Sequence, residues 1–155
     1  MSGQRIELLL ESRVLERIEP DERALLGYWE KARRADADAR LPGTSTEGAF
    51  DRAYQAAFLL ATATLHASGY RVRGRAGGHH YNTFYAISDL GAPELVRLGG
   101  ELNDLRGRRH EALYEAVAEL PVADLERLRS AADEFFHIAR NRLIAAYPEL
   151  AGRLR

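Results

Sequence analysis

The residues between 106 and 114 carry the side chains best suited to chemistry. Arg106, His110 and Tyr114 are spaced four residues apart, so on a helix they form one row, and Arg109 lies beside that row. A guanidinium is a permanent clamp for anionic oxygens, and an imidazole exchanges protons near neutral pH. A tyrosine with its ordinary pKa of about 10 is a poor general base, but it donates hydrogen bonds and stacks on planar groups. The segment therefore predicts an anion site in which His110 is able to move a proton.

Arg109 also continues a row of apolar residues. This row has the three-to-four spacing of one helix face and consists of Leu95, Leu98, Leu102, Leu105, Ala112, Leu113, Ala116 and Leu120. Because a guanidinium keeps its charge, Arg109 in such a row must pair, face a polar cavity or lie at a subunit boundary. A purely structural alternative is that Arg109 extends its stem along the core to solvent, while His110 and Tyr114 form an ordinary polar border. Lys31 is the only lysine, so arginine is common throughout the chain and each one is weaker evidence for a site.

Helical periodicity dominates the sequence, and convincing strand alternation is absent. We expect one helix over residues 5–17 and a second that begins after an Asp21 cap. A capping box of Thr44 and Glu47 predicts the start of an alanine-rich third helix, which ends at Gly69. Later helices are expected at three places: a short one with Phe84, Ile87 and Leu90, a long one from Pro93, and a last one from Pro121 to residues 147–148. The sequence thus predicts an all-α, single-domain helical bundle of about five to six helices over residues 1–155.

Composition and charge narrow the class of protein. The chain has 155 residues, a formal net charge of -1 and no cysteine. A nearly neutral chain does not indicate nucleic acid or an anionic membrane as a partner for the whole surface, so any basic site must be local. Without cysteine, a disulfide framework and a thiolate metal site are excluded. The apolar run at residues 8–10 is too short for a signal-peptide core, and no run is long enough to cross a bilayer, so we expect a cytoplasmic protein with no membrane association.

The sequence Arg109-His-Glu-Ala-Leu-Tyr114 resembles the recurrent motif of the HEPN superfamily of helical, nucleotide- and RNA-associated domains. In that motif an arginine is followed at once by Asn, Asp or His, and a histidine stands a few residues further on. Here Tyr114 occupies the position of that histidine. The order of elements is also similar, because an alanine-rich helix, a Gly/Arg connection with His79 and His80, and a short helix precede the motif, and a long helix follows it. The resemblance covers residues 46–147, whereas the helices within residues 1–40 have no recognised relation.

The resemblance implies a homodimeric bundle that binds RNA or a nucleotide. In HEPN ribonucleases the arginine steadies the scissile phosphate, and the histidine assists proton transfer during attack by the RNA 2′-hydroxyl. The catalytic residues would then be Arg109, His110 and Tyr114, in a metal-independent endoribonuclease of a toxin–antitoxin or defence system that needs no cofactor. Many such proteins are encoded beside a small nucleotidyltransferase, which is therefore an expected partner. Because Tyr114 replaces the motif histidine, the alternative is a non-catalytic dimeric helical interaction module that has lost ribonuclease activity.

Two further groups of residues, together with Arg106, complete the expected RNA- or nucleotide-binding set. Arg71, Arg73 and Arg75 lie in a glycine-rich stretch whose backbone could approach phosphates closely. That stretch lacks the helix-opening Gly-Lys-Ser/Thr of a Walker-type loop, and a solvated loop is the alternative. The second group is the adjacent pair of residues 79–80, both histidine. Neighbouring residues on a helix seldom bind one metal ion together, so we expect no metal site.

The last expected helix contains a second partial match to the HEPN motif. Arg140 and Asn141 have the residue types that open the motif, but no histidine follows them. We interpret both as surface or dimer-contact residues. His137, which is next to Phe135 and Phe136, is interpreted as a histidine at the edge of the core rather than as a catalyst.

Overall fold

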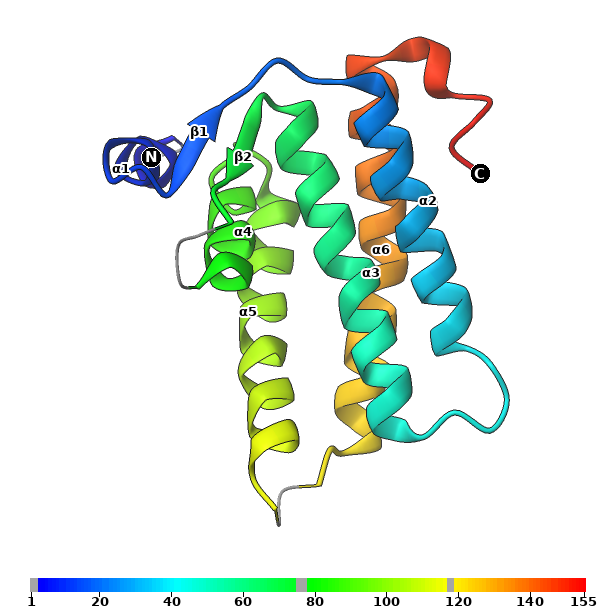
Figure 1. The fold of residues 1–155 in the computed structure, drawn as a ribbon. Coiled ribbons are helices and arrows are strands. Elements are labelled where there is room, and N and C mark those ends of the chain that lie inside the picture. The colour runs from blue at the N-terminus through cyan, green and yellow to red at the C-terminus, as the bar shows by residue number, and fades with distance from the viewer. Residues whose placement is uncertain (1–2, 75–77, 117–118) are drawn as a thin grey trace.

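The computed structural model describes residues 3–74, 78–116 and 119–155, which fold as an all-α, single-domain helical bundle (Figure 1). The elements in chain order are α1 (Gln4–Glu11), β1 (Leu15–Arg17), α2 (Glu22–Ala39), α3 (Thr46–Ala67), β2 (Tyr70–Val72), α4 (His79–Ile87), α5 (Pro93–Tyr114), α6 (Val122–Ala146) and the 3₁₀-helix η1 (Pro148–Leu150). The six α-helices within these described ranges confirm the predicted fold class.

The long helix α3 is the centre of the bundle, with α2 and α6 on one side and α4 and α5 on the other (Figure 1). Its buried face is built largely from alanine, and short side chains let neighbouring helices approach closely. Trp29 of α2 packs edge-to-face against Phe136 of α6, with ring centroids 5.4 Å apart. Phe50 and Tyr54 of α3 are also buried. This packing fixes the direction of the α3 side chains that face α5.

The N-terminal segment differs from the sequence prediction. Instead of one helix over residues 5–17, α1 ends at Glu11 and the strand β1 follows. The chain turns at Arg13, whose φ of 59° lies in the left-handed region and interrupts helical geometry. β1 then pairs antiparallel with β2, with Leu15 opposite Val72, and both of these side chains are buried. The expectation of a chain without strands is therefore wrong, because strand pairing at this point depends on a distant segment rather than on local periodicity.

Side-chain caps define the starts of α2 and α3. The Oδ1 of Asp21 accepts a hydrogen bond from a backbone N–H in the first turn of α2, which confirms the predicted cap. The predicted capping box of Thr44 and Glu47 is wrong. Ser45 caps α3 instead, because its Oγ accepts a hydrogen bond from the N–H of Gly48 at 3.0 Å.

The later helices begin close to their predicted positions, but two of them end earlier than predicted. The short helix is expected to include Leu90, and the apolar row of the long helix is expected to reach Leu120. In the structure α4 ends at Ile87, and α5 ends at Tyr114 because the backbone of the next residue is extended.

Gly69 follows α3 with a φ of 90°, a left-handed conformation that glycine adopts without steric cost. Pro93 is the first residue of α5, and Pro121 immediately precedes α6. One difference concerns the histidines. His79 and His80 form the first turn of α4 rather than part of the connection before it.

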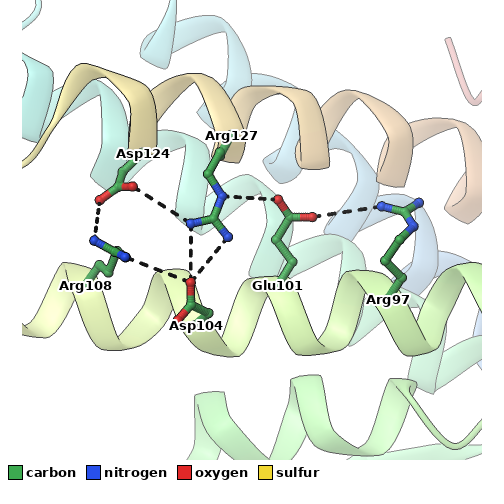
Figure 2. Close-up of polar contacts among 6 residues, drawn as sticks. All are labelled: Arg97, Glu101, Asp104, Arg108, Asp124 and Arg127. Atoms are coloured by element: carbon green, nitrogen blue, oxygen red, sulfur yellow. Dashed lines mark hydrogen bonds and ion pairs between the residues drawn. The ribbon is translucent and has the colours of Figure 1, made fainter.

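A network of ion pairs joins α5 to α6 (Figure 2). Arg127 of α6 contacts the carboxylates of Glu101 and Asp104, with N–O distances of 3.6 and 3.3 Å. Arg108 of α5 lies 3.4 Å from the carboxylate of Asp124, whose side chain is only 8% exposed. Exposed ion pairs contribute only about 0–1 kcal/mol each. Together, however, they fix the rotation of α5 about its axis. The two sides of α5 next to the one that faces α6 are therefore turned toward α3 and α4.

The packing of α4 against α5 depends on one residue without a side chain. A Cβ atom on Gly99 of α5 would overlap the Oγ of Ser88 and lie 2.6 Å from the backbone oxygen of Phe84. Ser88 can rotate, but the backbone oxygen can move only if α4 moves with it. Gly99 therefore sets how closely the C-terminal part of α4 approaches α5.

We expect Gly99→Ala to destabilise the protein by about 1–3 kcal/mol, the usual cost of overpacking. Gly100→Ala is the matched control, because Gly100 is exposed and a Cβ atom there would have nothing within 4 Å. The control variant should be more stable than the parent by about 0.5–1 kcal/mol, since alanine favours a helix over glycine. Urea denaturation followed by circular dichroism measures both changes. Equal stabilisation by the two substitutions would contradict the close approach of α4 and α5 at Gly99.

Candidate functional site

A cavity of about 280 Å³ lies where α3, α4 and α5 meet. Its lining combines a cation, a carboxylate, an amide, an imidazole and aromatic rings, and consists of Asp51, Tyr54, Gln55, Phe58, Leu59, His80 and Arg109. Small-molecule sites usually have volumes of about 300–1,000 Å³, so this cavity suits one group of a larger ligand. The structure brings Arg109, a predicted catalytic residue, to the same cavity as His80, a predicted binding residue.

Arg109 is held by a carboxylate and an aromatic ring of α3. Its Nε donates to the Oδ1 of Asp51 at 2.8 Å, and its Nη2 lies 2.7 Å from the same oxygen. The guanidinium carbon lies 5.0 Å from the ring centre of Tyr54, within the range of a cation–π interaction. Of the three environments that the sequence allows for Arg109, the structure therefore shows pairing at the edge of a polar cavity. Among the described residues, Nη1 has no ion-pair or hydrogen-bond partner, so it is available to a ligand.

His80 is fixed by two aromatic side chains of α3. Its Nδ1 lies 2.9 Å from the hydroxyl oxygen of Tyr54, and its ring stacks on Phe58 with centroids 3.9 Å apart. Burial lowers the pKa of His80, and the charges of His79 and of two nearby arginines lower it further. The imidazole is therefore neutral at pH values near 7, and it can accept a proton.

Tyr54 links the cation of the site to the imidazole. Its side chain is buried, its ring lies under the guanidinium of Arg109, and its hydroxyl contacts His80. Burial raises the pKa of Tyr54, and the opposing effect of the Arg109 charge is smaller. The phenol thus stays protonated and orients the imidazole through a neutral hydrogen bond.

His79 faces a different cavity from His80. That cavity has a volume of about 260 Å³ and shares Phe58 and Leu59 with the first. The Nδ1 of His79 is buried and has no hydrogen-bond partner in the part of the chain that the structure describes. Burial lowers the pKa of His79. The two adjacent histidines therefore do not form a common site.

The other predicted residues of α5 lie outside the cavity that Arg109 lines. The guanidinium carbon of Arg106 lies 5.5 Å from the ring centre of Tyr81. The rings of His110 and Tyr114 contact each other with centroids 4.6 Å apart, and Tyr114 is 75% exposed. The structure thus brings Arg109 to an imidazole of α4 rather than to the two predicted catalytic partners on its own helix.

The predicted arginine-rich binding stretch is engaged in ion pairs within the small sheet. Arg71 donates to the Oε1 of Glu16 from Nε at 2.8 Å and from Nη2 at 2.6 Å. The Nε of Arg73 lies 3.4 Å from the other carboxylate oxygen. The hydrogen bond from Arg71 is the main reason why the pKa of Glu16 lies below its usual value. Arg75 lies outside the described residues, and neither described arginine lines the cavity that contains Arg109.

The candidates in α6 have other roles. Arg140 donates hydrogen bonds to the backbone oxygens of Leu154 and Ala151, so it fastens the C-terminal segment to α6. Asn141 is exposed. His137 is exposed as well, rather than at the edge of the core, because it points away from the side of α6 that buries its aromatic neighbours.

The α3 partners of Arg109 and His80 are not identified as site residues from the sequence. The sequence interpretation places Tyr54 in the apolar stripe of the third helix and gives Asp51 no role. A signal is present, because Asp51, Tyr54 and Phe58 are spaced three and four residues apart and share one helix face. No local pattern shows that this face meets α5.

Among the described residues, no group of three or more His, Cys, Asp or Glu side chains could hold a metal ion. None of the helices in these residues is long and apolar enough to cross a membrane. No protein-family model, curated protein or solved structure matches the chain. Any function must therefore be inferred from the geometry of the site.

Three histidines, of which His66 is buried and His79 and His80 are partly buried, predict that stability depends on pH. Burial lowers the folded-state pKa of His66, His79 and His80 below the value of about 6.5 expected in the unfolded chain. As the pH falls below that value, the unfolded state binds more protons than the folded state, and the free energy of unfolding decreases. We expect this decrease between about pH 7 and about pH 5 in urea denaturation, and a smaller one in His80→Gln.

The exposed His137 supplies the control for this measurement. His137→Gln removes an imidazole without touching the cavity, so it should keep the pH dependence of the parent. The same pH dependence in the parent and in His80→Gln would contradict the partly buried, neutral state of His80.

Proposed function

We propose that this chain is a HEPN-like protein that binds RNA and cleaves it without a metal ion, using Arg109 and His80. The main support is that Arg109, the first residue of the HEPN-like motif, lines one cavity with an imidazole kept neutral by burial. Tyr114, which stands in the place of the motif histidine, is exposed and outside that cavity. In this proposal His80 takes the proton-transfer role that the resemblance implies for the position of Tyr114 and that the residue types indicate for His110.

The proposed reaction is an intramolecular phosphoryl transfer. The 2′-oxygen of RNA attacks the adjacent phosphorus, and the bond from phosphorus to the 5′-oxygen of the next nucleotide breaks. In the tautomer in which the Nδ1–H of His80 donates to the Tyr54 oxygen, Nε2 takes the proton of the 2′-hydroxyl. The imidazolium then returns a proton to the leaving 5′-oxygen. The products are a 2′,3′-cyclic phosphate and a 5′-hydroxyl.

Arg109 stabilises the charge that develops on the phosphate oxygens. Its contacts to Asp51 use Nε and Nη2, which form one edge of the guanidinium, and leave the donors of Nη1 for the phosphate. Asp51 restricts the rotamers of Arg109 before the ligand arrives, which reduces the entropy cost of binding. Its negative charge also weakens the attraction for phosphate. We therefore infer that Asp51 positions Arg109 and does not itself act on the substrate.

The HEPN resemblance also supports three proposals about the biological setting. We infer a homodimer, a role in a toxin–antitoxin or defence system, and a small protein of nucleotidyltransferase type as partner. Arg109 and His80 come from the same chain, so the proposed chemistry does not require a residue from a second copy.

A non-catalytic dimeric interaction module is the second candidate function. It is favoured by the contacts of Arg109 with Asp51 and Tyr54, because a structural arginine needs such partners. In that case Arg109 would mainly join α5 to α3. Its removal would then lower the melting temperature sharply, whereas removal of a catalytic arginine would mainly lower activity.

We expect the purified protein to cut total cellular RNA in the presence of excess EDTA. Arg109→Ala and His80→Gln should each lower the rate by about 10²–10⁴-fold, because they remove charge stabilisation and proton transfer respectively. Arg34 of α2 is exposed and is not part of the cavity, so Arg34→Ala is the matched control and should cut at the rate of the parent. Products should end in a 2′,3′-cyclic phosphate, and a 2′-deoxy group at the cleavage position should prevent cutting.

Two results would contradict the assignment in different ways. Cutting by Arg109→Ala at the rate of the parent would exclude this cavity as the active site. No cutting by the parent at any protein concentration, together with a large fall in the melting temperature of Arg109→Ala, would favour the interaction module.

A further inference from the structure

Arginine and aromatic side chains of α1, α4 and α5 form a row outside the cavity described above. This arginine–tyrosine row consists of Arg5, Tyr85, Tyr81, Arg106, His110 and Tyr114. The guanidinium carbon of Arg5 lies 4.7 Å from the ring centre of Tyr85. Tyr85 in turn stacks on Tyr81, with centroids 5.7 Å apart and planes inclined by 18°. Because Arg106 lies over Tyr81, the contacts are continuous from α1 to α5.

The row continues toward the C-terminal end of α5. Arg106, His110 and Tyr114 are one turn apart, and at 1.5 Å per residue they span about 12 Å. Tyr114 is 75% exposed, and Tyr81, the large aromatic residue at the other side of Arg106, is 44% exposed. The row therefore presents open aromatic surface to solvent on both sides of a cation.

The two arginines of the row are not neutralised by carboxylates. Among the described residues, neither Arg5 nor Arg106 has an ion-pair partner, whereas Arg108 and Arg127 of the α5–α6 network are paired. The Nε of Arg106 is buried and has no hydrogen-bond partner in the same part of the chain. Each guanidinium lies over a tyrosine ring, and no carboxylate of the described residues occupies its terminal nitrogens.

This combination fits single-stranded nucleic acid better than a duplex or a protein. Arginine binds the phosphates of a single strand, and its bases stack on aromatic rings whatever their sequence. A duplex keeps its base faces inside the stack, so it has none to offer to Tyr81 or Tyr114. Protein interfaces instead have an apolar centre that is poor in charge. We propose that the arginine–tyrosine row binds single-stranded RNA independently of its sequence, an inference that rests on the proposed function because the bound strand would be its substrate.

Arg106 connects the row to the cavity. It precedes Arg109 by one turn of α5, and its charge contributes to the lowered pKa of His80. The Nδ2 of Asn103 donates to the backbone oxygen of Tyr81 at 3.4 Å, which holds the first turn of α4 beside α5. A strand bound along the row therefore passes next to Arg109 and His80.

Fluorescence anisotropy with a labelled, unstructured RNA oligonucleotide tests the row. A 2′-O-methyl group on every ribose of the RNA prevents cleavage, so binding can be measured with the parent protein without a substitution that inactivates it. Tyr81→Leu and Tyr114→Leu each remove a stacking surface and should raise the Kd about tenfold or more. Arg106→Gln should also raise the Kd, and it should reduce the slope of log Kd against log salt concentration by about 0.7, the loss of one phosphate contact.

Tyr70→Leu is the matched control for the tyrosine substitutions. Tyr70 also lies under an arginine, with the guanidinium carbon of Arg17 5.5 Å from its ring centre, but it belongs to β2 and not to the row. This variant should bind RNA as the parent does. A duplex of the same sequence should bind the parent at least about tenfold more weakly than the single strand. Melting curves from circular dichroism identify any variant that is not folded.

The row is overturned if Tyr81→Leu and Tyr114→Leu bind RNA as the parent does, or if the parent binds duplex and single strand equally. Altered self-association of these variants with unchanged RNA binding would also overturn it, and would identify a protein interface. The proposed cleavage is judged separately. If the parent cuts RNA and Arg109→Ala binds RNA without cutting it, cleavage at the cavity is supported, whether or not the row binds RNA. If the parent never cuts RNA but the row variants still bind it more weakly than the parent does, RNA binding by the row is supported and the proposed cleavage is refuted.

Discussion

The guanidinium of Arg109 keeps its charge under physiological conditions, and it stands at the end of a row of fully buried leucines. The fold satisfies this charge with two groups of α3, the carboxylate of Asp51 and the ring of Tyr54. The hydroxyl of the same tyrosine holds the imidazole of His80. The need to pair the charge of Arg109 therefore determines where the guanidinium, the carboxylate of Asp51 and the imidazole of His80 come together. A phosphate that enters the cavity would find its binding groups already in place, which reduces the cost of binding.

This arrangement depends on the position of α5 between its neighbours. On one side, ion pairs to α6 fix its rotation, and Arg127 reaches two carboxylates of α5 (Figure 2). On another side, Gly99 allows the C-terminal part of α4 to approach α5 closely, and the first turn of the same helix carries His80 to the cavity that Arg109 lines. Single exposed ion pairs add little to stability, so we interpret the network mainly as a device for orientation.

The fold could be predicted where its causes are local. Helical periodicity gives the class, and Pro93 opens a helix because its ring fixes the backbone in a helical conformation. The strand at Leu15 could not be predicted, because it is stabilised by a partner far away in the sequence. Arg109 stood out as a charge within an apolar row, but the cavity that it shares with His80 depends on how three helices pack. The motif position of Tyr114 pointed to a partner on the same helix, whereas the structure exposes that side chain.

The imidazole NMR signals of histidine-labelled protein test most directly whether Arg109 and His80 bind the same phosphate. A 2′-deoxy oligonucleotide, which lacks the attacking hydroxyl and is not cleaved, serves as the ligand. Its addition should shift the signals of His80 and leave those of the exposed His137 in place, and the shift of His80 should disappear in Arg109→Ala. Equal shifts of both histidines, or a shift of His80 that persists without Arg109, would contradict a shared site.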